Sequence, residues 1–379
     1  MELENRYDIA VIGGGLAGLA FAIQGAHAGY KVVLFERETY PFHKVCGEYI
    51  SHENWNFLQE LGLPLSDWHL PNISRLLISA PNGKHIEQDL PLGGFGISRY
   101  RIDDALAQLA IKAGVHVFDD TKVLNVMYRN NSCLVFTNKG ETEALVAAGT
   151  FGKRSNLDVK WKRNFTRIKP NKLNHYVGVK YHVRIPYPPD QIALHNFEGG
   201  YCGISRIEDN KCCLCYLTTA YHLRRNKNDI HELEKIILMQ NPFLKTIFSE
   251  AEFLYKEPVT ISRISFNKKS QIEQHVLLIG DAAGMITPLC GNGMSMALHG
   301  SKLAFEQAND FLKGRINRFE MEQQYTQQWE KHFGKRVITG RIIQRFFGSA
   351  TLTNGLLAVV KPFPRFINWL ISLTHGQPY

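Results

Sequence analysis

The feature that most constrains this chain is a glycine-rich turn close to its N-terminus. Gly13, Gly15 and Gly18 follow an apolar stretch and precede a run of small residues, and a second apolar stretch ends at Glu36. The pattern predicts a strand, a tight turn, a helix and a second strand, which together form a dinucleotide-binding βαβ unit. These glycines would allow the turn, the approach of a pyrophosphate to the helix N-terminus and close packing of the helix on the strand.

The acid that closes this unit indicates which dinucleotide fits. Glu36 follows the last glycine at about the 20-residue spacing at which a carboxylate accepts hydrogen bonds from both hydroxyls of an adenosine ribose. A phosphate at the 2′ position would be repelled there, so the motif favours FAD or NAD over NADP. A glycine-rich structural turn is the alternative interpretation, but the strand before the motif and the helix after it favour dinucleotide binding.

Composition narrows the class of protein. The 379 residues are enough for two or three interleaved lobes, and 44% of them are hydrophobic, as in ordinary globular proteins. The net charge of +9 would suit nucleic acid, an acidic membrane surface or an anionic substrate. Because the basic residues are scattered and no nucleic-acid motif is present, we expect no nucleic-acid partner.

The cysteines predict free thiols and no metal site. There are seven, an odd number, and the chain begins directly with a strand rather than a signal peptide, so we expect a reducing, cytoplasmic location. Cys212, Cys213 and Cys215 lie in one predicted strand whose alternation sends neighbours to opposite faces, and no second ligand pair completes a metal site. Core packing is the favoured interpretation.

The order of predicted elements gives an α/β (α+β) fold. Residues 176–217 are rich in strands and aromatic residues and predict an antiparallel substrate-binding sheet. Residues 276–284 return to the opening theme of a buried strand and a loop before a helix, and the chain becomes helical from Asn317. We therefore predict a discontinuous Rossmann-type domain (1–65, 94–165 and 271–315), a β-sheet substrate domain (66–93 and 166–270) and a C-terminal helical segment (316–379).

Three further motifs, in matching order, carry a family resemblance over roughly residues 6 to 310. Gly280-Asp281-Ala282-Ala283-Gly284, continuing to Ser295, resembles the flavin-dependent enzymes of the para-hydroxybenzoate hydroxylase fold. Pro41-x-x-Lys44-x-Cys46-Gly47-Glu48 and Ser98-Arg99-x-x-x-Asp103-x-x-Leu106 resemble the geranylgeranyl reductase branch, which is related to flavin-dependent monooxygenases and halogenases.

The resemblance implies an FAD cofactor and a role for each matching residue. Asp281 would accept hydrogen bonds from the ribityl hydroxyls, Pro288 would line the isoalloxazine, and Arg99 would hold the phosphates. The N–H groups at the start of a helix near Asn292 would face the N1/C2 edge of the flavin, and Val123 would meet the adenine. The full cofactor-binding set is Gly13, Gly15, Leu16, Ala17, Gly18, Glu36, Arg37, Arg99, Val123, Asp281, Pro288, Gly291, Asn292, Gly293 and Met294.

Two departures from the family pattern affect the expected chemistry. Ala147-Ala148-Gly149-Thr150 stands where members of this fold usually carry an Asp-Gly pair, which removes one carboxylate near the cofactor. The Trp-x-Trp-x-Ile-Pro signature of halogenases is absent from the sequence. Dedicated halogenation is therefore disfavoured, and a flavin- or lipid-binding protein without turnover is a further alternative.

Two reactions remain open, because the fold does not choose the chemistry. Reduction of carbon–carbon double bonds in a prenyl or polyketide-type substrate leads, with Cys46 as a proton donor or gate, Lys44 lowering its pKa, and Glu48 as a third candidate. Aromatic hydroxylation follows closely. Its phenol would be bound by residues of the strand-rich region: Tyr181, His182 and Tyr201, with His175 and Tyr176 as further candidates. Core packing is the alternative for Cys46 and for these aromatics. The electron donor is either NAD(P)H or a reduced carrier.

The C-terminal segment suggests two roles, and the sequence predicts no oligomeric state. Basic residues interleaved with apolar ones could rest on acidic lipid and admit an apolar substrate, or could form a helical cap with a solvated basic face. The cap is slightly favoured. These residues are Lys331, Lys335, Arg336, Arg341, Arg345, Lys361 and Arg365.

Overall fold

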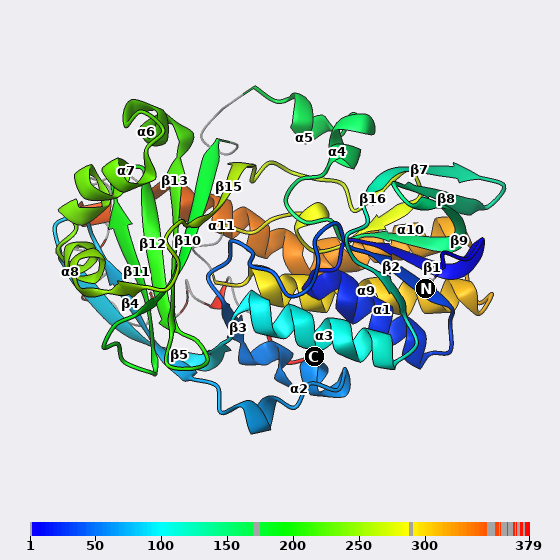
Figure 1. The fold of residues 1–379 in the computed structure, drawn as a ribbon, viewed down its shortest axis with the longest axis horizontal. Helices are drawn as coiled ribbons and strands as arrows, with labels where there is room; N and C mark the ends of the chain where they lie inside the picture. The colour runs from blue at the N-terminus through cyan, green and yellow to red at the C-terminus, as the bar shows by residue number, and fades with distance from the viewer. Residues whose placement is uncertain are drawn as a thin grey trace.

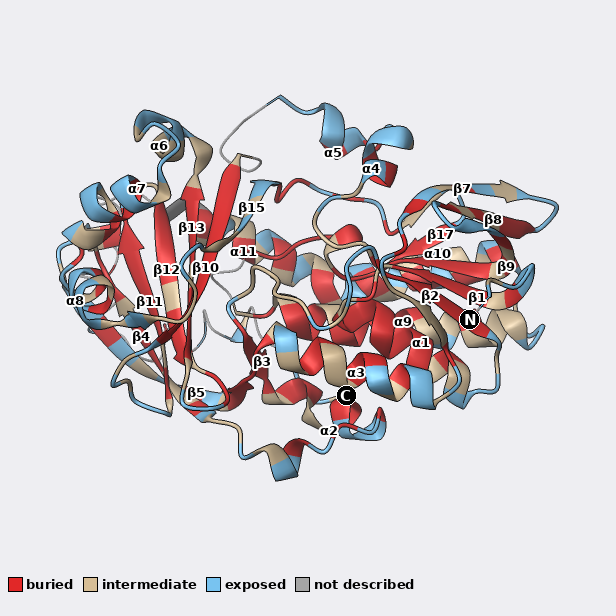
Figure 2. Cartoon of the chain, in the orientation of Figure 1, coloured by how far each residue is buried: buried red, intermediate tan, exposed pale blue. Residues whose placement is uncertain are grey.

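The computed structural model describes residues 2–169, 175–287 and 291–346, and in the C-terminal tail residues 353–355, 357, 362, 367, 369, 372, 373 and 376–379. Two β-sheets form the ends of the molecule, and helices lie between and around them (Figure 1). Figure 2 shows that the strands of both sheets are mostly buried. The α/β class with a Rossmann-type unit and a second sheet is confirmed.

The first sheet, which we call the cofactor sheet, contains the predicted βαβ unit. Its main strands run in the order β16-β17-β9-β1-β2-β6, and β17, β9, β1, β2 and β6 are parallel to one another. A meander of β7 and β8 joins β9. The bounds are β1 Arg6–Ile12, β2 Val32–Phe35, β6 His116–Phe118, β7 Val123–Arg129, β8 Ser132–Thr137, β9 Gly140–Gly149, β16 Ile272–Glu273 and β17 Val276–Leu278.

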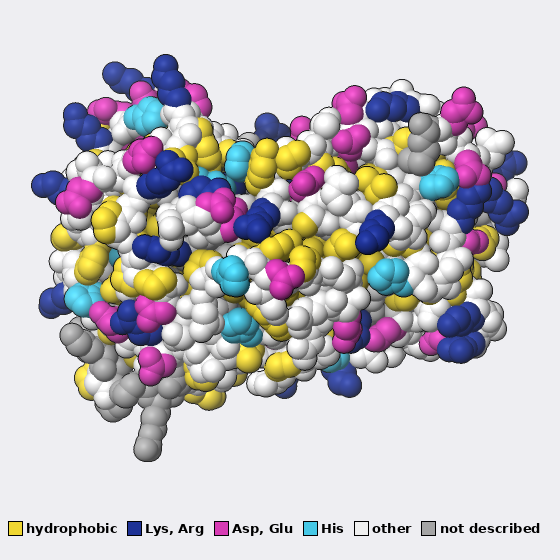
Figure 3. All heavy atoms as spheres, turned by 60° about the horizontal axis from the view of Figure 1, so that its bottom comes forward, with side chains coloured by type: hydrophobic (Ala, Val, Ile, Leu, Met, Phe, Trp, Pro, Cys, Tyr) yellow, Lys and Arg dark blue, Asp and Glu magenta, His cyan; other side chains and the backbone are white. Residues whose placement is uncertain are grey.

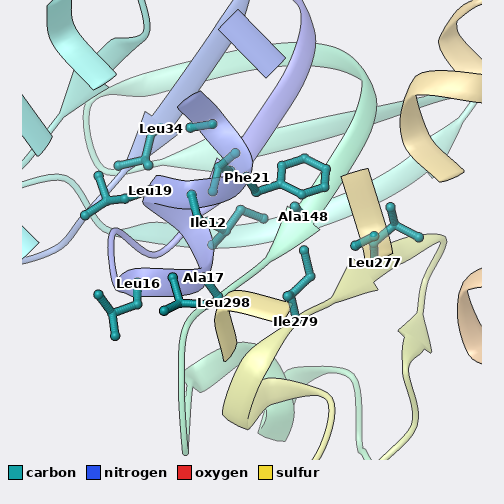
Figure 4. Packing of buried hydrophobic residues seen from close by; sticks show 14 of the residues in the cluster. Ile12, Leu16, Ala17, Leu19, Phe21, Leu34, Ala148, Leu277, Ile279 and Leu298 are labelled. Atoms are coloured by element: carbon teal, nitrogen blue, oxygen red, sulfur yellow. The ribbon is translucent and has the colours of Figure 1, made fainter. Parts of the chain in front are cut away.

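Helices cover the cofactor sheet, as continuous apolar strands require. The helices α1 (Leu16–His27), α3 (Arg99–Lys112), α9 (Gly293–Leu312) and α10 (Arg318–Trp329) bury their apolar sides in one core with the strands. Figure 4 shows Phe21 of α1, Leu298 of α9 and Leu277 of β17 packing into this core. The core fixes the glycine turn between β1 and α1 at one edge of the sheet.

The second sheet, which we call the substrate sheet, has nine strands. Its order is β14-β10-β13-β12-β11-β4-β5-β3, and β15 also pairs with β10. The pairs are antiparallel as predicted, except that β4 and β11 run parallel. The bounds are β3 Tyr49–Ser51, β4 Asn72–Ser79, β5 His85–Gly96, β10 Tyr176–Arg184, β11 Gln191–Phe197, β12 Gly200–Arg206, β13 Cys212–Thr219, β14 Glu252–Phe253 and β15 Val259–Ile264.

Each face of the substrate sheet has its own apolar cluster. The outer face packs against α7 and α8 through residues that include Tyr181, Cys202 and Tyr216. The inner face carries a second cluster that includes Tyr201, Leu194 and Leu217. The helices on the outer side are α6 Ala220–Arg225, α7 Ile230–Ile236 and α8 Pro242–Glu250, with a short 3₁₀ turn at Leu238–Gln240.

The C-terminal segment continues α10 through one π-helical turn, Glu330–Gly334, into α11, Lys335–Phe346. Within the described residues, no helix is both long enough and apolar enough to cross a membrane. The remaining helical segments are short: His52–Asn54, α2 Trp55–Glu60, Leu65–Trp68, α4 Asn156–Lys160, α5 Asn164–Arg167 and Gly280–Ala282. The predicted domain boundaries stay a prediction. The strand β3 and residues 94–96 of β5, which the prediction placed in the cofactor domain, pair within the substrate sheet.

Candidate active site

The glycine turn is shaped by close backbone contacts. Gly13 has φ +109°, and a Cβ there would lie 2.7 Å from the Thr150 carbonyl oxygen. A Cβ on Gly18 would overlap the carbonyl oxygen of Gly13 and lie 2.6 Å from the Thr150 hydroxyl. Because even a methyl group does not fit, α1 packs directly on the end of β1. The first turn of α1 is thereby held at the carboxyl edge of the cofactor sheet, where a phosphate would bind.

Glu36 is fixed beside this turn by backbone donors. Its carboxylate accepts hydrogen bonds from the N–H groups of Gly14 at 2.9 Å, Arg37 at 2.8 Å and Glu38 at 3.2 Å. The side chain of Arg37 points to solvent, where it pairs with Glu38, so only its backbone is close to the site. Val123 is buried at the start of β7 and is not among the residues that line the cavity described below.

Two cations face the open side of the glycine turn. A Cβ built on Gly15 would lie 3.4 Å from Nη2 of Arg99 and 3.7 Å from Nζ of Lys44. Both cations bind the buried Asp103, Arg99 at 2.7 Å and Lys44 at 3.0 Å. The sequence predicted that Lys44 acts on Cys46, but Asp103 holds Lys44 at the glycine turn. Nζ of Lys44 lies there 3.8 Å from the carboxylate of Glu36. Two cations beside a helix N-terminus are the arrangement that a pyrophosphate needs.

One cavity of about 530 Å³ connects the glycine turn with the inner face of the substrate sheet. Its cofactor side is lined by the turn, by the loop that carries Cys46, and by the start of α9. Its other side is lined by aliphatic residues of the substrate sheet and of the C-terminal segment. The main lining residues are Gly15, Leu16, Ala17, Cys46, Glu48, Arg99, Thr150, Lys153, Asp281, Gly291, Gly293, Met294, Leu76, Ile78, Ile86, Ile192, Leu194, Tyr201, Gly203, Cys215, Ile343, Leu357 and Ile367.

The second cofactor segment is held from behind by a buried lysine. Nζ of Lys269 donates to the carbonyl oxygens of Asp281 at 2.7 Å and Lys153 at 3.0 Å. Burial lowers the pKa of Lys269 to about 8. Asp281 is among the residues that line the cavity. Gly291, with φ +64°, precedes Asn292, the N-cap of α9, while Pro288 and Cys290 lie outside the described residues.

Glu48 joins the two sheets through a buried network of charges. Its side chain is fully buried and has Lys180 at 2.6 Å and His182 at 2.6 Å. It also accepts the N–H of Arg99 at 2.8 Å, at the start of α3. Burial alone would raise the pKa of Glu48, but Lys180 and His182 outweigh it and lower the pKa to about 2. Glu48 is thus a permanent anion, an anchor rather than a proton donor at neutral pH.

This anchor positions Cys46 in the cavity. Glu48 has φ +56°, an unusual conformation for a residue with a side chain, which the three contacts hold in place. Two residues earlier, the carbonyl oxygen of Cys46 accepts a hydrogen bond from the Cys213 thiol at 3.2 Å. The Cys46 side chain also interacts with Arg99. Burial alone would lower the pKa of Arg99, but the interactions with Asp103 and Cys46 are stronger and raise that pKa. Cys46 therefore lies between the cofactor turn and the substrate sheet.

One buried group has the composition of a metal site. Ligand atoms of Glu48, His182 and Cys213 lie within 4.8 Å of one another. However, the Glu48 carboxylate is already neutralised by Lys180, which donates at 2.6 Å, and burial raises the pKa of the Cys213 thiol well above its usual value. A cation would have to compete with that ammonium, so the geometry describes an ion-pair network. The six cysteines that the structure describes are free thiols.

The substrate-binding predictions need correction, because neighbouring residues of one strand cannot face one cavity. The Tyr181 side chain lies on the outer face of the sheet, where its hydroxyl donates to Glu234 at 3.0 Å. His182 is on the inner face but covers Glu48 instead of lining the cavity. Tyr201 does line the cavity. Of the two further candidates, Tyr176 packs on Phe266, and His175 contacts Arg224 near the surface.

Sequence reasoning missed Lys180, Lys153, Lys269 and Thr150. Lys180 offered a signal, since a lone charge in the apolar strand 176–183 requires a buried partner. Its partner, Glu48, is remote in the sequence, and no local pattern connects the two. Thr150 is the last residue of the stretch Ala147-Ala148-Gly149-Thr150, and its hydroxyl donates to the carbonyl oxygen of Ile12 at 3.0 Å.

Comparison with known proteins agrees with this geometry. Residues 7–147, which include the glycine turn, Arg99 and most of β9, match the family model of pyridine nucleotide-disulphide oxidoreductases. The chain is an FAD-dependent oxidoreductase. This flavoprotein is similar to Conditioned medium factor receptor 1 of Dictyostelium discoideum, with 25% identity over 87% of this chain and 69% of the relative. It is also similar to Digeranylgeranylglycerophospholipid reductase 2 of Methanopyrus kandleri, with 24% identity over 87% of this chain and 84% of the relative.

Solved structures show the same fold. A geranylgeranyl bacteriochlorophyll reductase-like protein from Thermoplasma acidophilum superposes with a TM-score of 0.79 at 18% identity, covering 99% of this chain and 97% of the other. A flavin-dependent brominase gives a TM-score of 0.79 at 17% identity, covering 98% and 93%. Reductases and halogenases thus share the architecture of this flavoprotein, and the fold does not distinguish their reactions.

The residues present suit FAD at several independent points. The turn at Gly15 is open toward Arg99 and Lys44, which would bind the pyrophosphate, and Glu36 would bind the adenosine ribose. Asp281 and the N-terminus of α9 face the same cavity, where they would hold the ribityl chain and the flavin ring. Bound there, FAD would supply the two-electron chemistry, and the protein would position a substrate on the inner face of the substrate sheet.

Proposed function

We propose that this flavoprotein reduces carbon–carbon double bonds of an apolar, prenyl or polyketide-type substrate. The observation that carries the proposal is the single cavity that joins the cofactor turn to an aliphatic surface. Aliphatic side chains on the substrate sheet would bind a hydrocarbon chain by burying it, and they offer few polar groups to orient a small polar molecule. The similarity to reductases of digeranylgeranylglycerophospholipid supports the same class of substrate.

Cys46 is the residue we propose as proton donor. Saturating a double bond requires a hydride at one carbon and a proton at the other, and bound, reduced FAD would supply the hydride. The Cys46 thiol lies in the cavity beside Arg99, whose cation would stabilise the thiolate that proton transfer leaves behind. Water would then return the proton to the thiolate. In this proposal Glu48 and Lys44 position the loop and the cofactor turn.

Aromatic hydroxylation is less well supported by the site. Of the five side chains predicted to bind a phenol, Tyr201 alone is among the residues that line the cavity. A carrier without turnover would have no need for a cysteine held between the cofactor turn and the apolar surface. Hydroxylation and binding without turnover are therefore kept as outcomes of the test.

The test is anaerobic reduction of the FAD-loaded protein, followed by mixing with a polyprenol such as geranylgeraniol. We expect the flavin absorbance to return without oxygen, and the product to gain two hydrogens for each saturated bond. Cys46→Ala should slow this step by roughly 10²-fold or more, as loss of a general acid does, while Cys133→Ala should not, since Cys133 is buried in the cofactor sheet. Oxygen incorporation into an aromatic substrate would contradict reduction, and no reoxidation by any substrate would favour a carrier. NADH, NADPH and a reduced carrier protein would then be compared as electron donors.

We also propose that α11 contacts an acidic membrane surface. Ile338 is 57% exposed and Ile342 is 50% exposed, and Ile342 lines the cavity as well. Lys331 and Lys335 are exposed nearby, whereas Arg336 is turned inward toward Glu53. The side chains of Arg345, Lys361 and Arg365, which the sequence also placed on this surface, lie outside the described residues. The variant Ile338→Asp should no longer sediment with anionic vesicles. If the native protein bound neutral vesicles as well as it binds anionic ones, the proposed attraction of its basic residues to acidic lipid would be contradicted.

On the face shown in Figure 3, Lys and Arg side chains are spread over both ends and interspersed with acidic ones. A single basic stripe, as nucleic-acid binding needs, is not present on that face. The absence of a nucleic-acid partner remains a prediction.

A further inference from the structure

One row of residues crosses the inner face of the substrate sheet from strand to strand. Cys215 of β13 pairs with Gly203 of β12, Gly203 with Leu194 of β11, Leu194 with Ile78 of β4, and Ile78 with Ile86 of β5. All five residues line the cavity. Because paired residues in neighbouring strands point to the same face, the row forms a continuous floor at right angles to the strands.

The floor begins beside the cofactor side of the cavity. Cys215 is paired on its other side with Lys180, whose ammonium binds Glu48 in the loop that carries Cys46. Apart from the Cys215 thiol, the row carries no polar side chain. A molecule lying along it would thus have one end near the proposed proton donor and the rest on hydrocarbon.

Gly203 is the residue of this row that has no side chain. A Cβ built there would approach Leu194 at 3.6 Å and the Cys215 carbonyl oxygen at 3.7 Å, which are ordinary contacts. Gly178 of β10 also lines the cavity, but its surroundings differ. A Cβ built on Gly178 would lie only 3.0 Å from Val45, so no side chain fits there without a shift. Backbone geometry therefore does not require glycine at position 203. A side chain at this position would instead occupy the space above the floor.

At the opposite end of the floor lie two described residues of the C-terminal tail, Leu357 and Ile367. Ile86 belongs to a small apolar cluster with Ala80, Leu357 and Ile367, and Ile78 packs against it. Leu357 and Ile367 are themselves buried and line the cavity. Among the described residues no strand pairs with β5 on the other side of Ile86, because β3 pairs with β5 only at residues 94–96. The cluster is thus an end wall.

The distance from Cys215 to Ile86 sets the length of chain that fits. Four strand spacings of about 4.8 Å give a floor of about 19 Å. An extended hydrocarbon advances about 1.3 Å per carbon, given carbon–carbon bonds of about 1.5 Å. The floor therefore accommodates a main chain of about 15 carbons.

We infer that this row is the binding bed for the hydrocarbon chain of the substrate, with Gly203 giving the chain passage and Ile86 setting its maximum length. The inference rests on the proposed function for the identity of the substrate, but it makes a separate claim about where the chain lies. It assigns specificity to two residues that touch neither the glycine turn nor Cys46. Cofactor binding and chain length should consequently respond to different substitutions.

The test uses the FAD-loaded protein and a ladder of straight-chain primary alcohols from 8 to 20 carbons, with binding measured by displacement of a fluorescent apolar probe. In the native protein we expect affinity to rise about fourfold per added carbon, which corresponds to about 0.8 kcal/mol for each buried methylene, and to level off near 15 carbons. Gly203→Val should weaken binding of the 15-carbon alcohol at least roughly 100-fold, the value of losing several methylene contacts. Ile86→Ala should move the plateau two or more carbons further.

Controls separate blocking of the floor from loss of the fold. FAD content and melting temperature are measured for each variant, and Gly203→Ala replaces the valine variant if the latter does not fold, with a smaller loss expected. Ile111→Ala, at a 52% exposed position on α3, should leave the length profile unchanged. A native profile in both Gly203→Val and Ile86→Ala would overturn the inference. If the profiles shift as expected but no alcohol or polyprenol reoxidises the flavin, the bed stands and the proposed reaction fails.

Discussion

The two sheets of this flavoprotein line one cavity in different ways: the cofactor sheet with the turns at its edge, and the substrate sheet with one of its faces. The central strands of the cofactor sheet are parallel and buried on both faces, so they offer only the turns at their carboxyl edge. The substrate sheet is mostly antiparallel, and one of its faces is left open toward the cavity. The glycine turn of the cofactor site is therefore made of neighbours in sequence, whereas the substrate site is made of alternate residues from many strands.

This difference explains why the two sites depend on different interactions. At the cofactor edge, the fit is set by backbone atoms, and a single methyl group on Gly18 would overlap another residue's carbonyl oxygen. On the substrate face, the fit is set by apolar side chains that can be exchanged if their volume is kept. Between them, Glu48 and Lys180 hold the loop of Cys46 with a buried ion pair. Four experiments would break or sharpen this comparison.

The largest effect is expected at the cofactor edge. Gly18→Val would drive side-chain atoms into the Gly13 carbonyl oxygen and the Thr150 hydroxyl, and a rigid backbone contact cannot be relieved by a change of rotamer. We expect the variant to lose bound FAD, as measured by the flavin absorbance of the purified protein. Gly300→Ala is the matched control, because a Cβ there meets its neighbours at 3.7 Å. Normal FAD content in Gly18→Val would show that the turn is not the cofactor site.

The junction between the sheets should be the next most sensitive. Lys180→Met leaves Glu48 as a buried charge without its ammonium partner, which should lower the free energy of unfolding by about 3–5 kcal/mol. The double variant Glu48→Gln/Lys180→Met should recover most of this loss, because no buried charge remains. Urea unfolding measures both, with Lys31→Met at an exposed ion pair as the control, expected within about 1 kcal/mol of the native protein. Equal losses in the single and double variants would contradict the ion-pair account.

The same pair predicts an acid dependence. The pKa of Glu48 is lowered from 4.5 to about 2 in the folded protein, so its contribution to stability is complete above about pH 4.5 and is lost as the pH falls toward 2. The native protein should therefore lose more stability across this range than the double variant does. Unfolding free energies at pH 5, 4 and 3 provide the measurement. Parallel curves would mean that Glu48 titrates normally.

The smallest effect is expected on the outer face of the substrate sheet. Tyr181→Phe removes one hydroxyl from Glu234, which also accepts a hydrogen bond from Tyr216. A cost of about 1 kcal/mol in stability is expected, with no change in the binding of apolar chains. Tyr201→Ala, on the inner face, should change chain binding. If the two variants had exchanged effects, the assignment of the faces would be reversed.

The sequence predicted the two sites unequally well, for the same physical reason. Gly13 to Glu36 act through neighbouring backbone atoms, so their spacing alone located the cofactor edge. Tyr181 and His182 were both expected in the substrate pocket, although alternation allows at most one of two neighbours to face it. Lys44 was expected beside Cys46, but Asp103, which draws it to the glycine turn, could not be identified as its partner without the fold.

The floor of the substrate site shows most clearly what local patterns cannot reveal. Its five residues come from five strands between positions 78 and 215, and each is an unremarkable apolar residue, cysteine or glycine in its own strand. Only the order and register of the strands bring them into one row. Local sequence contains no such information, because strand pairing is set by contacts distant in the chain.

The central claim is that the edge of the cofactor sheet binds FAD while the face of the substrate sheet binds the hydrocarbon chain. Its most direct test compares the native protein with Gly203→Val in a single anaerobic turnover. Both are loaded with FAD, reduced, and mixed with geranylgeraniol while flavin absorbance is recorded. The account predicts equal FAD content and equal reduction, but reoxidation by the polyprenol only in the native protein, because the cofactor edge is intact while the floor is blocked. Equal reoxidation in both proteins would contradict a chain bound on the face of the substrate sheet.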